Sequence, residues 1–302
     1  MRRINTGRDC HPEDVTKMTP TLLVYSDMDG SLLDHFSYTH IPAKSMLEKL
    51  QKAGIPMIPA TSKTRAELIE LRRVLDNHHP FIVENGAAVF IPEGYFKKQP
   101  AGTRLVENYW VKSFCAPRQQ WLDLILDNWA DFSDDFTTFA ESSIEEIAEM
   151  TGLKHEEAKR ASLREYGEPV KWNGSEEQLK RFSWALERKG AYIQQGARFI
   201  HVSGKTDKGM AMQWLSLEYM RQPTVSDCCT IAIGDGKNDI AMLEAADHAL
   251  VIRSPVHDPL QLSRPDSVVI SEGFGPEGWA EGMETILESL PFSTRKQEKC
   301  YG

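Results

Sequence analysis

Short apolar runs, four of which end in a polar cluster, restrict the fold of this chain more than any other feature. Five of them fit buried parallel strands, at residues 22–25, 81–83, 230–233, 249–252 and 268–270. A sixth run, at residues 55–60, fits less well because its two prolines cannot donate hydrogen bonds to a neighbouring strand. Amphipathic segments between the runs predict helices, at residues 43–53, after Thr64, and at 207–219 and 238–246. This alternation predicts an α/β fold whose core is a doubly wound, Rossmann-like parallel sheet.

Residues 92–202 follow a different pattern. They contain most of the tryptophans, and long polar helices are predicted at residues 117–130, 143–151 and 154–165. Two strands are expected in the same segment, at residues 103–114 and 191–202. We therefore expect an inserted α+β domain at residues 92–202 and an α/β core made of residues 20–91 and 203–302. Residues 1–19 precede the first run and are expected to form a disordered extension.

Charge and composition argue against several classes of protein. The 302 residues carry a formal net charge of -9, which disfavours a general nucleic-acid binder. No apolar run approaches the ~20 residues of a membrane helix, and the N-terminal segment lacks the apolar stretch of a secretory signal. The five cysteines are scattered without a CxxC pair, as is usual in a reducing compartment. We expect a cytoplasmic protein, monomeric or homodimeric, with no nucleic-acid or membrane partner.

Polar clusters lie where the predicted strands end. In open α/β sheets, ligands bind beyond the carboxyl ends of the strands. The sequence places four clusters there: Asp27 with Asp29, Thr61 with Ser62 and Lys63, Glu84 with Asn85 and Gly86, and the segment from Gly234 to Asp239. Their convergence predicts one binding or catalytic site at this edge of the sheet.

The acidic members of these clusters are Asp27, Asp29, Asp235 and Asp239. Four carboxylates at neighbouring strand ends repel one another strongly at short range and low dielectric, and a divalent cation relieves that repulsion. Oxygen ligands select a hard ion, and Mg²⁺ suits a site that keeps waters and shares a phosphate. A helix N-cap is the competing interpretation for Asp235 or Asp239 taken alone, but it does not account for all four acids. We therefore expect a Mg²⁺ site.

The first cluster has the residue types that phosphoryl transfer needs. A carboxylate held beside Mg²⁺ can attack phosphorus and form an aspartyl-phosphate, a role that fits Asp27. Asp29 comes two residues later, on the same side of an extended strand. There it is placed to protonate the leaving oxygen and then to deprotonate the water that releases phosphate.

Four motifs in order resemble those of a known family. "DMDGSLLD" resembles the first motif of the haloacid dehalogenase (HAD) superfamily of phosphatases, with Ser31 where threonine is commoner. Thr61 stands where the second-motif hydroxyl is expected, and Lys208 in "GKTDKGMAM" fits the third-motif lysine. "GDGKND" matches the GDxxND pattern of the fourth motif. The insertion between the second and third motifs is similar to a type IIB cap, so the resemblance implies a HAD-like core with an α+β cap.

Further stretches narrow the resemblance. "TSKTRAE", "ENGAAVFIP", "AKRASLREYGEP" and "GARFIHVSGKTDKG" are similar to the mannosyl-3-phosphoglycerate phosphatase family, over about residues 20–290. That implies Mg²⁺-dependent hydrolysis of a small phosphorylated sugar-glycerate, mannosyl-3-phosphoglycerate, to mannosylglycerate and phosphate. A related sugar-phosphate or glucosyl-3-phosphoglycerate phosphatase is the main alternative. A phosphomutase of the same fold is a further alternative that the core motifs cannot separate, because it shares the catalytic core. A non-catalytic binding module that kept the fold agrees less well with the intact motifs.

The resemblance also implies a role for each motif residue. Asp27 is the expected nucleophile, and Asp29 is the expected general acid and base, with its carbonyl on the metal. Thr61 would donate to the phosphoryl group, and Lys208 would neutralise charge. The expected metal ligands are Asp27, Asp29, Asp235 and Asp239, and the expected substrate-binding residues are Ser62, Lys63, Arg65, Asn85, Gly86, Arg164, Arg198 and Asn238. A solvated helix turn is the competing interpretation for Lys63 and Arg65, and a cap surface or structural pairing for Arg164 and Arg198.

Overall fold

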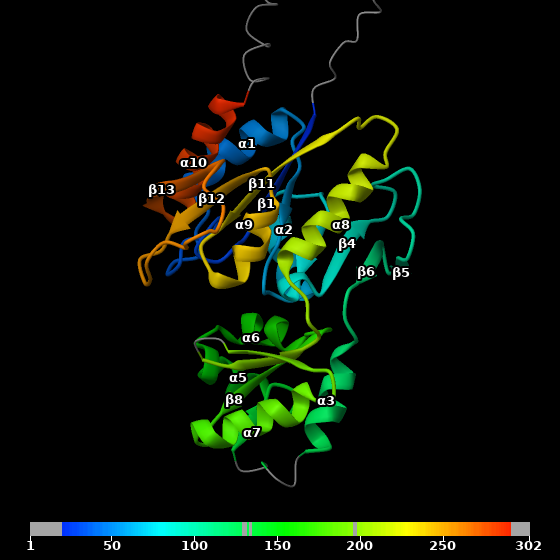
Figure 1. The fold of residues 1–302 in the computed structure, drawn as a ribbon, viewed down its shortest axis with the longest axis vertical. Helices are drawn as coiled ribbons and strands as arrows, with labels where there is room; N and C mark the ends of the chain where they lie inside the picture. The colour runs from blue at the N-terminus through cyan, green and yellow to red at the C-terminus, as the bar shows by residue number, and fades with distance from the viewer. Residues whose placement is uncertain (1–19, 129–131, 133–134, 196–197, 291–302) are drawn as a thin grey trace, which may run out of the picture.

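The computed structural model describes residues 20–128, 132, 135–195 and 198–290. The extension predicted at residues 1–19 lies outside these ranges, as does the end of the helix predicted for residues 117–130. Figure 1 shows two bodies joined by two chain connections. The upper body, here called the core, contains both ends of the described chain, and the lower body, here called the cap, is formed by its middle.

A five-stranded parallel sheet forms the centre of the core. Its order is β13–β12–β11–β1–β2, with bounds Val268–Phe274, His248–Arg253, Cys228–Gly234, Thr21–Ser26 and Met57–Pro59. Ser26 is level with Ile233 on one side and with Pro59 on the other. The carboxyl ends of these three strands therefore meet at one edge of the sheet.

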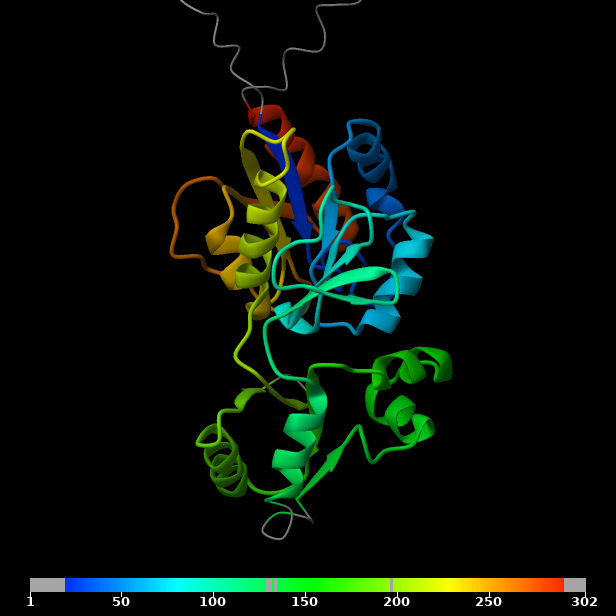
Figure 2. The same cartoon turned by 90° about the vertical axis from the view of Figure 1, so that its right-hand side faces the viewer.

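Helices cover both faces of this sheet (Figure 1, Figure 2). They are α1 and α10 on one face and α8 and α9 on the other, with bounds Lys44–Lys52, Gly275–Ser289, Lys208–Met220 and Ile240–Ala245. Val24 packs with the first pair and its neighbour Leu23 with the second, because side chains alternate along a strand. The central strands are thus buried on both faces, as their continuous apolar runs predict, and the doubly wound α/β core is confirmed.

The run at residues 81–83 forms a buried strand that contacts two sheets. β3 (Phe81–Val83) pairs antiparallel with β4 (Ala88–Pro92), and a single parallel bridge between Ile82 and Ala60 joins it to the central sheet. The chain reverses because the three residues after β3 all have positive φ, which is 46° at Glu84, 57° at Asn85 and 88° at Gly86. The run is thus parallel to the central sheet, as predicted, but the sequence does not predict its antiparallel pairing with β4.

β3 and β4 belong to a second sheet, of order β3–β4–β6–β5. The segment predicted as one strand at residues 103–114 is a hairpin of β5 (Arg104–Val106) and β6 (Tyr109–Ser113), which turns at Glu107 with a φ of 53°. Since β6 pairs with β4, this hairpin extends the core. We therefore propose that the inserted domain begins after Ser113 rather than at residue 92.

The cap is built on an antiparallel sheet of order β7–β8–β10–β9, with bounds Phe136–Thr138, Gly167–Trp172, Ile200–Ser203 and Tyr192–Gln195. Its helices are α3, α5, α6 and α7, with bounds Arg118–Leu126, Ile144–Thr151, His155–Ser162 and Glu176–Glu187. A cluster that includes Trp121 and Phe182 joins α3 and α7 to this sheet. The inserted α+β domain is thus confirmed, although β7, β8 and α7 are not among the elements that the sequence predicts. In the part of the chain that the structure describes, no helix is both long enough and apolar enough to cross a membrane.

Candidate active site

Asp27 lies directly after β1, at the carboxyl edge of the central sheet. Its N–H donates to the carbonyl of Ile233 at 2.9 Å and so continues the pairing of β1 with β11. The indole N–H of Trp279 donates to the Ser26 hydroxyl at 2.9 Å, and that hydroxyl donates to the Asp27 carbonyl at 2.7 Å. These buried bonds hold the Asp27 backbone in one position. The sequence does not reveal this support, because Trp279 is remote from Asp27 along the chain and belongs to no motif.

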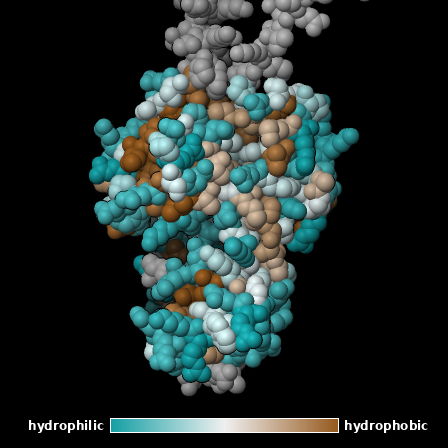
Figure 3. Space-filling view, viewed as in Figure 1, coloured by the Kyte–Doolittle hydropathy of each residue, from teal (hydrophilic) through white to brown (hydrophobic). Residues whose placement is uncertain are grey.

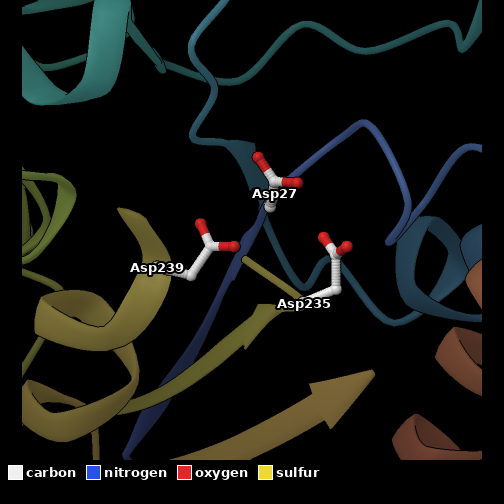
Figure 4. A group of neighbouring side chains, drawn as sticks. All are labelled: Asp27, Asp235 and Asp239. Atoms are coloured by element: carbon white, nitrogen blue, oxygen red, sulfur yellow. The ribbon is translucent and has the colours of Figure 1, made fainter. Parts of the chain in front are cut away.

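Three buried carboxylates meet at this edge, those of Asp27, Asp235 and Asp239 (Figure 4). One oxygen atom from each lies within 4.8 Å of the others. Asp235 follows β11, and Asp239 closes a short 3-10 turn, where its Oδ2 accepts the N–H of Gly236 at 2.9 Å. The structure therefore brings together three of the four acids that the sequence places at strand ends.

Lys208 is the cation among these acids. It begins α8, its side chain is fully buried, and its Nζ lies 2.5 Å from Asp27 Oδ1 and 2.6 Å from Asp239 Oδ1. Burial alone would lower the pKa of Lys208, but the carboxylates of Asp239 and Asp27 raise that pKa above its ordinary value. The ammonium group therefore stays charged. We call Lys208 and the three aspartates the acidic centre.

The acidic centre has more negative than positive charge. Burial raises the pKa of Asp27 well above its ordinary value, Asp239 raises it further, and Lys208 offsets this in part. Burial and the charge of Asp239 also raise the pKa of Asp235 to about 6. When all three carboxylates are ionised beside one ammonium group, two negative charges are left in excess. A buried set of oxygen ligands with this excess fits a hard divalent cation such as Mg²⁺.

The turn after Asp27 packs tightly against Asp235. Gly30 has a φ of 79°, and a Cβ at this position would lie 2.6 Å from Asp235 Oδ2. Both the backbone conformation and the close approach therefore require glycine. The Ser31 hydroxyl donates to Asp235 Oδ1 at 3.2 Å, so the serine that replaces the commoner threonine orients one of the acids. His257 belongs to none of the sequence motifs, and its Nε2 lies 3.8 Å from Asp235 Oδ2.

Asp29 lies outside the group of three acids. β1 ends at Ser26, so the extended conformation that would align Asp29 with Asp27 does not continue through the turn. The Asp29 carboxylate pairs instead with Lys63, whose Nζ lies 2.9 Å from Oδ2. Its Oδ1 is buried and accepts no hydrogen bond from the described residues, which is unfavourable until a proton donor binds there. The side chain is thus not part of the metal set, and contact through the Asp29 carbonyl stays a prediction.

The second motif forms a rigid loop beside the acids. Thr61 is fully buried, and its Oγ1 accepts the N–H of Lys63 at 3.1 Å. α2 (Arg65–Val74) begins directly after this loop, with the capping box of Thr64 and Glu67 that the sequence predicts. The Lys63 side chain is only 18% exposed, so the interpretation of this residue as part of a solvated helix turn is wrong.

The loop after β3 joins two parts of the site. The amide of Asn238 donates to Asn85 Oδ1 at 3.0 Å, which connects this loop to the turn that carries Asp239. Gly86 packs against the start of α8, where a Cβ would lie 2.0 Å from the Asp207 carbonyl oxygen. The predicted substrate residues Asn85, Gly86 and Asn238 therefore lie together, next to the acidic centre.

The candidate arginines have different surroundings. The Arg164 side chain is 10% exposed, and it donates across the junction of cap and core to the Ser62 carbonyl at 3.1 Å. Arg65 is neutralised by Glu165 at 2.6 Å and by Glu107 at 3.1 Å. Arg65 therefore has two close structural ion pairs that compete with a substrate role. Arg164 lies between the two bodies and faces one carboxylate at longer range, with its Nε 3.4 Å from Glu84 Oε2.

Arg198 has a structural contact on the outside of the cap. It is exposed and donates to the carbonyl of Thr151 at 2.6 Å, at the C-terminal end of α5. Such a contact satisfies a carbonyl that the helix leaves free. Structural pairing therefore accounts for Arg198, and Arg164 is the arginine best placed for a substrate.

A small pocket lies at the junction of core and cap, where Figure 3 shows a recess in the surface between the two bodies. This junction pocket is lined by Glu84, Asn85, Arg164, Tyr166, Gly167, Tyr192, Gln194, His201, Ser203 and Thr206. Its free volume of about 20 Å³ holds about one water molecule. Burial, and to a lesser extent the charge of Arg164, lowers the pKa of His201 to about 4.

A larger cavity of about 480 Å³, between α1 and the end of α2, contains none of the predicted site residues.

Comparisons with known proteins agree with this site. The model of the haloacid dehalogenase-like hydrolase family matches residues 24–254. A glucosyl-3-phosphoglycerate/mannosyl-3-phosphoglycerate phosphatase of Methanococcoides burtonii is 34% identical over 267 residues, which are 88% of this chain and 97% of that protein. The region that the family model matches includes all four motifs and the whole cap.

Solved structures share the fold. A HAD subclass IIB sugar phosphatase superposes with a TM-score of 0.56 at 18% identity, over 88% of this chain and 98% of that one. The sucrose-phosphatase of Synechocystis sp. PCC6803, solved with sucrose and phosphate, gives a TM-score of 0.53 at 13% identity, over 89% and 98%. At these identities the likeness concerns the fold. The family match and the 34% identical relative show that this chain belongs to the haloacid dehalogenase-like hydrolases.

Proposed function

We propose that this chain hydrolyses mannosyl-3-phosphoglycerate to mannosylglycerate and phosphate, with the glucosyl compound as an alternative substrate. The chain is a phosphatase of its family. The observation that supports the finer assignment is the place of Arg164, a nearly buried guanidinium between cap and core, beside the loop that contacts the acidic centre. A glycerate carboxylate close to the phosphate needs such a cation, ideally a bidentate one.

The residues of the acidic centre fit Mg²⁺ as the cofactor. Asp27, Asp235 and Asp239 would hold it, since their oxygen atoms lie within 4.8 Å of one another and their charge exceeds that of Lys208. When bound, the ion would neutralise negative charge on the carboxylates and on the phosphoryl oxygens.

Asp27 is the nucleophile of the proposed reaction. Lys208 holds Asp27 Oδ1, so Oδ2 is the oxygen placed to attack phosphorus. As the bond from Oδ2 to phosphorus forms, the bond from phosphorus to the glycerate oxygen breaks, and an aspartyl-phosphate results. The Thr61 hydroxyl would donate to a phosphoryl oxygen, and its burial keeps it oriented before the substrate binds.

Asp29 transfers the protons. Its acid form would donate to the leaving glycerate oxygen. The resulting carboxylate would take a proton from the water that attacks phosphorus, and the bond to Asp27 Oδ2 would then break and release phosphate. Lys63 holds Asp29 Oδ2, which leaves the unpaired Oδ1 as the oxygen that exchanges the proton.

The junction pocket is the proposed site for the rest of the substrate. Arg164 would bind the carboxylate, and Tyr192, Gln194 and His201 offer hydrogen-bonding groups for sugar hydroxyls. Because the pocket has room for about one water molecule, a substrate enters only if the cap moves relative to the core. Closure of the cap would then exclude bulk water from Asp27.

A phosphate-release screen with Mg²⁺ tests this proposal. It should include mannosyl- and glucosyl-3-phosphoglycerate, 3-phosphoglycerate, sucrose phosphate and hexose phosphates. We expect the highest kcat/KM for the glycosylated phosphoglycerates. Faster release from a sugar phosphate without the carboxylate would refute the substrate assignment and leave the phosphatase activity standing, and transfer of phosphate to a second sugar would identify a mutase.

A further inference from the structure

Glu84 is a buried carboxylate that the proposed reaction does not use. It follows β3 with a φ of 46°, a conformation that residues other than glycine rarely adopt. Its side chain reaches from the core into the cap. Oε1 accepts the N–H of Glu165 at 2.7 Å, and Oε2 accepts those of Tyr166 at 3.2 Å and Gly167 at 2.9 Å. One core carboxylate thus binds three consecutive backbone N–H groups of the cap, and Arg164, with Nε 3.4 Å from Oε2, balances its charge.

The two chain connections between core and cap lie side by side. They are residues 114–117, which lead from β6 to α3, and residues 204–207, which lead from β10 to α8 (Figure 1). A Cβ on Gly204 would lie 2.4 Å from the Cβ of Cys115, so the two connections touch. A cap that moves as a body therefore turns about this one place.

The cap segment that Glu84 binds is also hydrogen-bonded to residues next to both connections. The carbonyl of Glu165 accepts the N–H of Arg118 at 2.7 Å, directly after the first connection. Gly167 pairs with Ser203, directly before the second connection. Hydrogen bonds so close to the hinge change little in length when the cap turns, and so they can persist through opening and closing.

The backbone at Glu84 and Asn85 is hydrogen-bonded to the second-motif loop of the site. Its N–H donates to the Lys63 carbonyl at 3.1 Å, and the N–H of Asn85 donates to the Thr61 carbonyl at 2.9 Å. The Asn85 side chain in turn accepts from Asn238, next to Asp239. One loop therefore connects the hinge of the cap with the second-motif loop and with the acidic centre.

We propose that Glu84 is a positioning residue, a non-covalent pivot that sets the cap, and with it Arg164, relative to Asp27. The selective part of this role rests on the proposed function, because it requires a substrate that spans the core and the cap. Both carboxylate oxygens take part in the contact, and a glutamine at this position would offer one acceptor and turn an NH₂ group toward the backbone N–H groups. Glu84→Gln therefore keeps the size of the side chain and removes the three-fold contact.

The kinetic test compares two substrates on Glu84→Gln. One is the glycosylated phosphoglycerate that the wild type prefers, and the other is p-nitrophenyl phosphate, a small ester without a carboxylate. We expect kcat/KM for the first to fall by about 100-fold, the effect of a displacement of about 1 Å. The small ester has no group that reaches the junction pocket, so its kcat/KM should change by less than about 3-fold. Glu107→Gln is the matched control, because Glu107 is an exposed carboxylate at the same junction that pairs with Arg65 alone, and both rates should stay unchanged.

A second measurement needs no substrate. Small-angle X-ray scattering of the metal-free variant should show a broader distribution of distances between cap and core than the wild type, and Glu107→Gln should not. Equal losses on both substrates, or a scattering profile like that of the wild type, would show that Glu84 is only structural and overturn the pivot.

Glu84→Asp, which is shorter by one methylene, replaces the glutamine variant if that one does not fold, and the same selective loss is expected. If the wild type rejects glycosylated phosphoglycerates, the proposed function fails while the scattering comparison still decides the pivot.

Discussion

The acidic centre around Asp27 and the junction pocket around Arg164 are neighbours, but their side chains come from different kinds of position. The centre takes its residues from strand ends and from the start of α8, and buried hydrogen bonds within the core fix each of them. The pocket combines a core loop with residues of the cap sheet such as His201, so its shape depends on where the cap lies.

This difference separates chemistry from recognition. The acidic centre offers what any phosphate monoester needs, namely a nucleophile, a cation and ligands for a metal. The junction pocket offers groups that only a larger anionic substrate reaches. Changes in the centre should therefore impair all substrates alike, whereas changes in the pocket should be selective.

The largest effect is expected for Asp27→Asn. The substitution keeps the shape of the side chain and removes its anionic oxygen, so kcat should fall by about 10⁴-fold or more on both the glycosylated phosphoglycerate and p-nitrophenyl phosphate. Because burial opposes the charge of Asp27, the variant should unfold at the same temperature as the wild type or at a higher one. Kinetics with both substrates and thermal unfolding check this. Near-normal turnover of purified Asp27→Asn would rule out the mechanism.

Removal of the metal should also affect both substrates equally. A chelator is expected to abolish turnover, and Mg²⁺ should restore it. Independently of turnover, Mg²⁺ should stabilise the metal-free protein by about 2.7 kcal/mol at a concentration of 100 times its Kd. Asp235→Asn should weaken this stabilisation, since it removes one of the three carboxylates. Full activity in excess chelator would exclude the proposed site.

A selective effect of intermediate size is expected for Arg164→Ala. The loss in kcat/KM on the glycosylated phosphoglycerate should correspond to about 2–4 kcal/mol, because the substrate carboxylate would be left without its partner. Hydrolysis of p-nitrophenyl phosphate should hardly change. Arg198→Ala removes the same guanidinium from the outside of the cap and should stay within about 0.5 kcal/mol on both substrates.

The same experiment can remove the distinction between the two regions. Arg164 also holds the Ser62 carbonyl in the second-motif loop. Equal losses on both substrates would show that Arg164 supports the acidic centre through this loop rather than binding the carboxylate. A selective loss in Arg65→Ala instead would move the carboxylate site to the other face of the junction.

The core and the acidic centre were largely predictable because their signals are local. An apolar run followed by an acid locates both a strand end and a site residue, as at Asp27 and Asp235, and the Thr64–Glu67 pair marks a helix start from side chains three residues apart. Where a turn intervenes, the same reasoning fails. Asp29 was expected beside Asp27 from the period of a strand that in fact ends at Ser26.

The cap and its junction were less predictable because they depend on contacts remote in sequence. Nothing near Glu84 indicates that its φ is positive or that its carboxylate meets residues 165–167. Arg164 and Arg198 are the same residue type on the same domain, and only the folded cap shows that one faces the core and the other caps a helix. The sequence likewise does not show that residues 103–114 and 191–202 each contain two antiparallel strands in place of one.

The smallest expected effect concerns His201 and the pH dependence of stability. Burial first, and the charge of Arg164 second, lower the pKa of His201 to about 4 in the folded protein. In the unfolded chain a histidine titrates near ~6.5, so below that pH the unfolded state binds a proton that the folded state does not. This contribution to stability is complete above about pH 6.5 and is lost as the pH falls toward about 4. The full shift corresponds to roughly 3 kcal/mol, and partial exposure of the ring reduces the expected loss to about 1–2 kcal/mol.

His201→Gln should remove this part of the acid sensitivity. Denaturant unfolding at pH 7 and at pH 4.5 should show that the wild type loses about 1–2 kcal/mol more than the variant between the two values. Arg164→Ala removes only the charge that lowers the pKa of His201 and leaves the burial. It should therefore reduce the loss of stability at pH 4.5 by less than His201→Gln does. His79, whose pKa burial also lowers to about 4, is present in every one of these proteins and so cancels. If the wild type and His201→Gln responded identically to pH, the ring would be solvated in solution, the pocket would be open there, and its residues would recognise a substrate only after the cap had closed.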